Sequence, residues 1–222
     1  MNKPNNGTLA LAIVVMVIAI DQALKIWVKT HFFYGEALDI TPWFKLQFIE
    51  NNGMAFGMEL GSKLLLTWFR IIAVVLFGYY LWRIRQRDDL PRGYVVCIAA
   101  ITAGAAANVI DCIAYGLLFD APPPPLVAQL LPPDGGYGTL FHGRVVDMLY
   151  FPLCEWNWPQ WMPWVGGEHF IFFQPIFNVA DAALSVSVIV LILFYSRQLA
   201  ANENGDTPTP SNDNDDTTAA TT

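Results

Sequence analysis

The sequence predicts a mainly α-helical membrane protein: four transmembrane helices with a small extracytoplasmic β-rich subdomain. Of the 222 residues, 55% are hydrophobic and only 14% are charged, whereas a soluble domain carries about 25% charged residues. Four segments also reach the roughly 20 mostly apolar residues that a helix needs to cross a bilayer. These segments cover approximately residues 9–28, 64–82, 94–115 and 175–196.

The first apolar segment is expected to remain in the protein as a membrane span. It could be mistaken for a secretory signal, but Asp21 and Lys25 interrupt its apolar run. No small-residue cleavage site follows it, as a cleaved signal requires.

Basic residues next to the spans predict their direction across the membrane. They gather before the first span, in the short loop between the second and third, and after the fourth: Lys3, Arg83, Arg85, Arg87, Arg92 and Arg197. Because short loops rich in Lys and Arg stay in the cytoplasm, both termini are expected to be cytoplasmic. The segments 30–62 and 116–174 are then expected to lie on the outer side.

Both outer segments are expected to fold. Segment 30–62 alternates apolar and polar residues and contains Asn52-Gly53, which is typical of a hairpin turn. Residues 121–138 form a Pro-rich insertion that is expected to be extended, to lie outside the membrane and to be able to cap the site. A strand-like stretch at 141–151 follows. Four tryptophans come next, and an interfacial anchor is favoured over ligand stacking for them: Trp156, Trp158, Trp161 and Trp164.

Residues 201–222 are predicted to form a disordered acidic tail beyond a membrane domain at 1–200. The tail contains five of the acidic residues, has no aromatic residue and is rich in Asn, Thr and Pro. Such a composition cannot bury enough apolar surface to fold.

No metal or other cofactor is expected. Cys97, Cys112 and Cys154 are odd in number and show no C-x-x-C spacing, so they are interpreted as structural thiols. The three histidines are scattered, and none has a second ligand at helical spacing.

Polar residues inside the spans are the candidate functional residues, because polar groups in a bilayer are costly and usually face the protein interior. At a rise of about 1.5 Å per residue, those in the spans fall in the outer third of a core of about 30 Å. They are Asp21, Asn108, Asp111, Asn178 and Asp181. Asn108 and Asp111 are three residues apart, as are Asn178 and Asp181, so each pair shares one helix face.

Asp147, in the strand-like stretch, can reach the same depth from the outer segment. For Asp21 or Asn108 a buried polar link between helices is an equally good interpretation. Two carboxylates near hydrocarbon, Asp147 and Asp181, repel each other unless they share a proton. Such a pair can activate water while polarising a peptide carbonyl, as in aspartic proteases. The chain has no H-E-x-x-H motif, no G-x-S-x-G motif, and no Ser/Lys pair placed at one depth.

Five sequence blocks occur in the order of a known family. They are "DQALK" (21–25), "ENNGMAFG" (50–57), "AGAAANVID" (103–111), "VVDMLYF" (145–151) and "FNVADAAL" (177–184). In these blocks the chain resembles the lipoprotein signal peptidases (signal peptidase II), aspartic proteases of the bacterial inner membrane. That family removes the signal peptide of prolipoproteins just before a diacylglyceryl-modified Cys. The resemblance implies that Asp147 and Asp181 are the catalytic dyad.

The resemblance also implies supporting roles for other residues. Three asparagines would hydrogen-bond the substrate backbone or hold the dyad: Asn51, Asn108 and Asn178. Asp21 and Lys25 would position the first helix and the outer hairpin, and Asp111 would support the site from the third span. The implied partners are diacylglyceryl prolipoproteins and membrane lipid, with no nucleic acid. The expected state is a monomer with its active site at the outer face of the inner membrane.

Three departures from the family pattern stand out. The family commonly has Arg directly after the third-span Asp, where this chain has Cys112. Arg144 is a candidate to replace that guanidinium, although an interfacial anchor is the favoured interpretation for it. Alanines replace some of the usual glycines before Asn108, and the insertion lengthens the connection between Asp111 and Asp147.

Two alternatives belong to other functional classes. The same carboxylates could form the proton relay of a small proton- or cation-coupled carrier. However, carriers usually show internal repeats and a site near the bilayer midplane, and this chain shows neither. A scaffold that merely resembles a protease would leave the two aspartates without a role.

Overall fold

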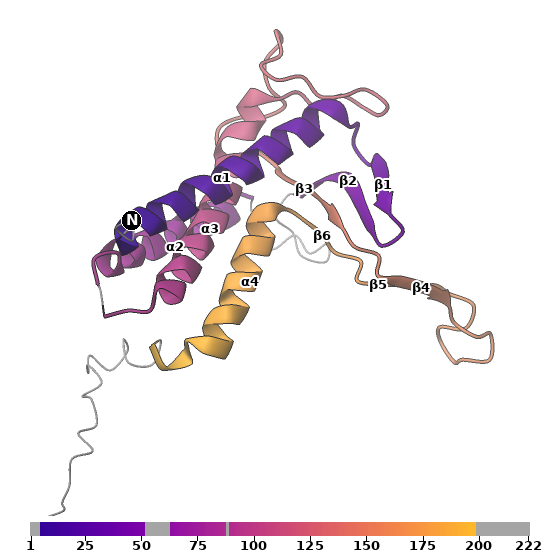
Figure 1. The fold of residues 1–222 in the computed structure, drawn as a ribbon. Helices are drawn as coiled ribbons and strands as arrows, with labels where there is room; N and C mark the ends of the chain where they lie inside the picture. Colours follow the sequence, from indigo (N-terminus) through magenta and orange to yellow (C-terminus); the bar gives the residue numbers. More distant parts are fainter. Residues whose placement is uncertain (1–4, 52–62, 88, 199–222) are drawn as a thin grey trace, which may run out of the picture.

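The computed structural model describes residues 5–51, 63–87 and 89–198. Its frame is a bundle of four helices: α1 (Asn6–His31), α2 (Lys63–Ile84), α3 (Arg92–Leu118) and α4 (Val179–Phe194) (Figure 1). The first three are long and apolar enough to cross a membrane, and α4 is a shorter apolar helix of 16 residues. The chain is therefore mainly helical, as predicted.

Helix α3 is the centre of the bundle and packs against each of the other three helices. Its buried face is rich in small residues such as Ala103, Gly104 and Ala107, which allow helix backbones to approach closely. A side chain at Gly104 would collide with the backbone carbonyl of Ala180 at the start of α4. The contact between α3 and α4 therefore depends on this glycine.

Helix α4 begins later than the predicted start near residue 175. Ile176–Phe177 form a short strand, β6, and Asn178 caps the helix. The Asn178 side chain accepts a hydrogen bond from the Asp181 backbone N–H at 2.9 Å, and the Asp181 carboxylate accepts one from the Asn178 backbone N–H. This reciprocal cap fixes the first turn of α4.

An antiparallel sheet lies beside the bundle, in the strand order β1-β2-β3-β6. Its other strands are β1 (Ala37–Thr41), β2 (Phe44–Asn51) and β3 (Val145–Tyr150). Asp147 lies opposite Ile49, and Glu50 lies opposite Val146. Because neighbouring residues of a strand point to opposite faces, Asp147 and Glu50 lie on different faces of the sheet. The predicted β-rich part is confirmed.

The Pro-rich insertion lies over the C-terminal ends of α1 and α3. Isolated β-bridges join Phe33 to Val127 and Phe119 to Leu130, and the Tyr137 N–H donates to the Phe119 carbonyl at 2.8 Å. The expected turn at Asn52-Gly53 and the tail at 201–222 lie outside the described residues.

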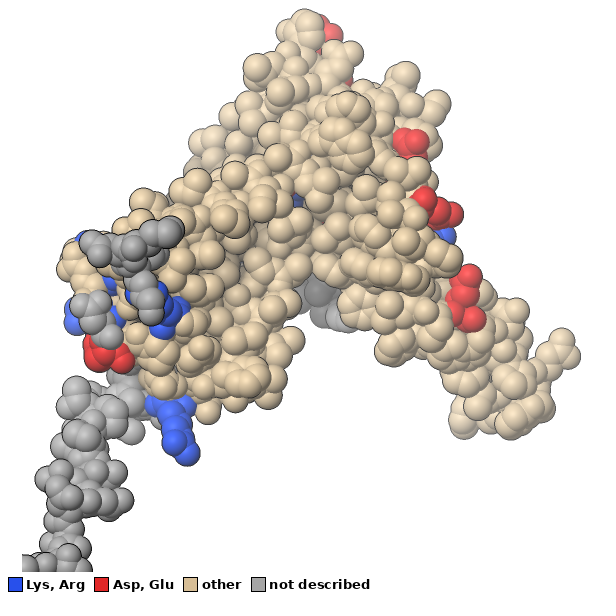
Figure 2. Space-filling view, in the orientation of Figure 1, with Lys and Arg blue, Asp and Glu red and all other residues tan. Residues whose placement is uncertain are grey.

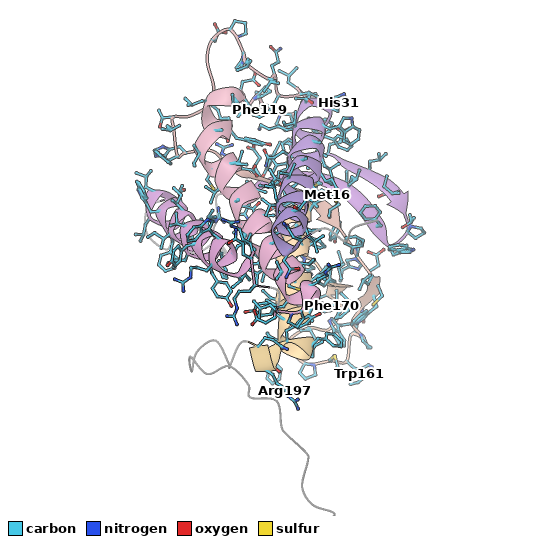
Figure 3. The ribbon with its side chains drawn as sticks, turned by 60° about the vertical axis from the view of Figure 1, so that its left-hand side comes forward. Met16, His31, Phe119, Trp161, Phe170 and Arg197 are labelled. Carbon is cyan, nitrogen blue, oxygen red and sulfur yellow. The ribbon has the colours of Figure 1, made fainter. Side chains whose placement is uncertain are left out.

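A separate two-stranded hairpin extends away from the helices (Figure 1). It consists of β4 (Cys154–Asn157) and β5 (His169–Phe172) and connects β3 to β6. In a second view, His31 and Arg197 lie at opposite ends of the molecule (Figure 3). The first residue closes α1, and the second follows α4.

Candidate active site

Asp147 and Asp181 meet where the sheet joins the start of α4. Asp147 is 2% exposed and accepts a hydrogen bond from Asn178 Nδ2 at 2.7 Å. Asp181 is half-buried and accepts one from Asn108 Nδ2 at 2.7 Å. The two asparagines also contact each other, since Asn178 Nδ2 lies 3.2 Å from Asn108 Oδ1. A continuous polar chain therefore joins the two carboxylates.

The surroundings of Asp147 favour its protonated form. Burial, followed by the nearby carboxylate of Asp181, raises the pKa of Asp147 to about 7. Hydrogen bonds from Asn178 and Asn51 oppose this rise because they favour the charged form. Near neutral pH, Asp147 can therefore hold or release a proton readily, as a general acid requires.

Asn51 ends strand β2 and reaches the same face of the sheet as Asp147. It lies opposite Val145 in the ladder and hydrogen-bonds the Asp147 carboxylate. Its register is what brings Asn51 to the site.

A buried lysine links the site to α1. Lys25 Nζ lies 2.8 Å from Asp21 and 2.7 Å from Asp111, and all three side chains are fully buried. Lys25 also donates to Asn108 Oδ1 at 2.8 Å. Because this oxygen accepts from Lys25, the amide nitrogen of Asn108 is turned toward Asp181. The lysine thus fixes the orientation of an asparagine that contacts the dyad.

The two acidic partners of Lys25 also hold backbone elements of the site. Asp21 Oδ1 accepts from the Ala180 N–H at 2.8 Å, which ties α1 to the first turn of α4. Asp111 Oδ2 lies 3.4 Å from the Val146 N–H, next to Asp147 on β3. All eight residues that the sequence singled out therefore belong to one connected site.

Sequence reasoning assigned no role to Gln22, which completes this network. Its Nε2 donates to Asp111 Oδ1 at 2.8 Å, and its Oε1 accepts from the Tyr115 hydroxyl at 3.0 Å. The signal was present in the sequence: Gln22 is an amide inside an apolar span, directly after Asp21.

Arg70 of α2 was also missed. Its guanidinium lies beside Cys112, the residue that stands where the family commonly has an arginine. Its guanidinium Nη1 is 3.1 Å from the Cys112 Sγ. Arg70 is the only Lys or Arg in the predicted span 64–82, which is the signal that could have found it. The proposed substitute, Arg144, instead donates to Glu50 at 2.8 Å and stacks over Tyr137.

A second buried charge cluster occupies the opposite face of the sheet. Lys29 forms an ion pair with Glu50, which also pairs with Arg144. Together with apolar side chains, these residues line a cavity of about 380 Å³, whose other wall includes Pro122 and Pro124 of the insertion. The insertion therefore covers this cavity rather than the face of the sheet that carries Asp147.

Comparisons with known proteins point to one family. The family model for signal peptidase (SPase) II matches residues 13–197. The chain is 43% identical over 216 residues to the lipoprotein signal peptidase of Porphyromonas gingivalis, covering 97% of this chain and 95% of the relative. It is 35% identical over 188 residues to that of Amoebophilus asiaticus, covering 82% and 75%. A solved bacterial membrane enzyme shares the fold, with a TM-score of 0.56 at 22% identity, covering 95% and 99% of the two chains.

Proposed function

The chain belongs to the signal peptidase II family, and from this premise we propose that Asp147 and Asp181 are the catalytic pair of an endopeptidase. As a lipoprotein signal peptidase, the protein is an aspartic peptidase of a bacterial membrane, and it removes signal peptides from prolipoproteins. We further propose that its substrates carry a diacylglyceryl group and are cleaved just before the lipidated Cys. The observation that carries the proposal is the polar chain Asp147–Asn178–Asn108–Asp181.

In this mechanism Asp147 starts protonated and Asp181 starts ionised. The pKa of Asp147, raised to about 7 by burial and by Asp181, supports this assignment. Asp181 takes a proton from the attacking water, whose oxygen bonds to the scissile carbonyl carbon, while Asp147 donates its proton to the carbonyl oxygen. When the tetrahedral intermediate collapses, the C–N bond breaks, the departing amine receives a proton from Asp181, and Asp147 takes back a proton from a hydroxyl of the intermediate, which becomes the carboxylic acid product.

The neighbouring residues keep the two carboxylates in place. Asn108 donates to Asp181 and is itself oriented by Lys25. Asn178 donates to Asp147 while capping the helix that carries Asp181. Their remaining polar groups are candidates to bind the substrate backbone, and Asn51 is another.

Arg70 would supply the guanidinium that the family pattern places after Asp111. It reaches Cys112 from α2, one helical turn beyond Asn108 on α3. An arginine inside a membrane span is costly, so its retention beside the site favours a role in binding carbonyl groups of the substrate.

We propose that both termini are cytoplasmic, that α4 is the fourth span, and that the dyad lies near the outer face of the inner membrane. The N-terminal end of α1, the loop between α2 and α3, and the end of α4 lie together (Figure 1), and Lys and Arg gather at this end (Figure 2). We also propose that the protein works as a monomer surrounded by lipid.

Substitution of either aspartate tests the catalytic assignment. Asp147→Asn and Asp181→Asn should each lower cleavage of a diacylglyceryl prolipoprotein by roughly 10²–10⁴-fold, the range for loss of a general acid or base. Asp39→Asn is the matched control, because Asp39 is an exposed carboxylate that forms a surface ion pair with Lys45. Cleavage at the normal rate by either dyad variant would show that the assignment is wrong.

A further inference from the structure

The β4–β5 hairpin, which we call the arm (residues 154–172), is inserted between the two halves of the proposed dyad. It follows β3, which carries Asp147, and leads through β6 to α4, which carries Asp181. The arm forms its own two-stranded sheet and is not part of the four-stranded sheet. An isolated hairpin is only marginally stable in water, so its surroundings have to stabilise it.

One face of the arm is aromatic. In the strand register Trp156 lies opposite Phe170, and Cys154 lies opposite Phe172. Trp156, Trp158 and Phe170 pack on one another, with ring centroids 4.6–5.8 Å apart. Trp156 and Phe172 nevertheless remain exposed, so this face has apolar surface that the described part of the chain leaves uncovered.

The other face of the arm is polar. Asn157 lies opposite His169, and Glu155 lies opposite Ile171. His169 contacts the Asn157 side chain at 2.9 Å and the Glu155 carboxylate at 3.3 Å. The arm is therefore amphipathic across its thickness, with aromatic rings on one side and hydrogen-bonding groups on the other.

The tip of the arm extends the aromatic face. Trp161 is 79% exposed and Trp164 is 96% exposed. Figure 3 shows Trp161 and Phe170 along the arm. Exposed tryptophans of this density are typical of the membrane–water interface, where the ring body is buried and the indole N–H meets polar headgroups.

The position of the arm relative to the helices indicates what covers it. Its second strand ends at Phe172, and the apolar helix α4 begins seven residues later at Val179. The base of the arm is therefore at the level where the chain enters the bilayer. From there the arm extends away from α4, and the two diverge (Figure 1). In Figure 2 acidic atoms on the arm appear near its base, on the edge that faces away from α4, and the edge facing α4 shows no charged residue.

We propose that the arm lies on the bilayer, with the aromatic face and the tip inserted at the boundary between lipid headgroups and acyl chains. The partner is the lipid surface of the same membrane that holds the helices. Residues 152–174 contain no Lys or Arg, so burial of aromatic surface, and not attraction to anionic lipid, stabilises this contact.

This placement has a consequence for the site. Both ends of the arm connect to the elements that carry Asp147 and Asp181, so a membrane-bound arm holds those carboxylates at a fixed height relative to the lipid surface. A substrate anchored by its own diacylglyceryl group would then meet the dyad at a matching depth.

The native thiol of Cys154 provides the test, because it is on the aromatic face and exposed, whereas Cys97 and Cys112 are buried. The full chain is placed as a single copy in zwitterionic lipid nanodiscs and treated with a charged, water-soluble maleimide. The matched control is Cys154→Ser/Asn157→Cys, which places the thiol three residues along the same strand but on the polar face. Cys154 should react at least about tenfold more slowly than the control, because a charged reagent does not enter the lipid that covers the aromatic face.

A second, neutral and lipid-soluble maleimide separates lipid from protein as the covering layer. If lipid covers the aromatic face, this reagent labels Cys154 readily. Replacing part of the zwitterionic lipid with anionic lipid should not change the rate at which this neutral reagent labels Cys154. Equal labelling of both positions by the charged reagent would place the arm in water and overturn the proposal. Protection of Cys154 from both reagents would mean that protein covers it, and this would overturn the proposal too. Neither measurement depends on cleavage activity, so failure of the proposed catalytic function would leave the result intact.

Discussion

Two lysines one helical turn apart on α1, Lys25 and Lys29, are both almost completely buried but are neutralised in different ways. Lys25 lies between two carboxylates, Asp21 and Asp111, and also donates to Asn108. Lys29 pairs with a single carboxylate, Glu50 of the sheet. Three aromatic rings also surround Lys29, with centroids 5.2–5.6 Å from its Nζ: Phe48, Phe119 and Tyr137.

The difference indicates that the partners of a buried lysine, and not its burial, determine whether it is linked to the proposed catalytic residues. The partners of Lys25 belong to α1 and α3 and contact the first turn of α4 and β3, so this lysine is connected to both proposed catalytic carboxylates. The partners of Lys29 lie on the opposite face of the sheet, under the Pro-rich insertion. Lys25 is therefore expected to affect catalysis as well as stability, and Lys29 to affect stability alone.

The largest effect is expected for Lys25→Met. It leaves Asp21 and Asp111 buried without a cation, and breaking a buried ion pair in this way costs about 3–5 kcal/mol. It also frees the amide of Asn108, so cleavage should be lost. The measurements are the midpoint of thermal unfolding in detergent and the rate of prolipoprotein cleavage. The double variant Lys25→Met/Asp111→Asn should recover part of the stability without recovering activity, and recovery of both would contradict a role in orienting Asn108.

A smaller effect is expected for Lys29→Met. Glu50 keeps Arg144 as a partner, so the loss of the lysine should cost about 1.5–3 kcal/mol, the range for a lost hydrogen bond to a charged group. The kcat/KM of the protein that remains folded should be unchanged, since Lys29 lies on the face of the sheet away from Asp147. A fall in kcat/KM as large as that of Lys25→Met would remove the distinction between the two clusters.

The sequence was sufficient to predict the helices and the β-rich part. It also named eight candidate residues that the structure joins in one hydrogen-bonded network. Six of them are polar groups in apolar spans, which are rare and have to meet, whereas Asn51 and Asp147 lie in outer segments, and Asn51 was named from the family resemblance. The sequence did not predict the second cluster, since Lys29 is adjacent to a span end and Glu50 lies in an outer segment, and charged residues are ordinary at both places. It did not predict the location of the insertion either, because the face of a sheet that a loop covers depends on strand register. Arg70 could have been found by the same rule that found Asp21.

Arg70→Leu tests whether the network of Lys25, Asp111 and the proposed dyad extends to α2. Loss of a charged donor should lower kcat/KM about tenfold or more, since hydrogen bonds to charged groups contribute about 1.5–3 kcal/mol. Adding Cys112→Arg should restore much of the loss, because the Cys112 Sγ is 3.1 Å from the Arg70 guanidinium, so an arginine at residue 112 can reach the same region. If Arg70 only holds α2 against α3, the single variant will lower the unfolding midpoint with kcat/KM unchanged, and Cys112→Arg will rescue nothing.

The mildest test changes only the pH. Burial and the Asp181 carboxylate raise the pKa of Asp147 from 3.8 to about 7. The folded state therefore binds the Asp147 proton more tightly than the unfolded state does, and the stability that this proton contributes is present below pH 3.8 and lost as the pH rises through about 7.

The pH dependence of cleavage should follow the protonation of Asp147. Because Asp147 has to be protonated, kcat/KM should decrease above pH 7, approaching about tenfold per pH unit. Asn51→Ala removes a hydrogen bond that lowers the pKa of Asp147, so it should move this alkaline limb to higher pH, whereas Lys29→Met should leave it in place. If the alkaline decrease in kcat/KM keeps its pH in Asn51→Ala but shifts in Lys29→Met, the titrating group belongs to the Lys29–Glu50 cluster and is not Asp147.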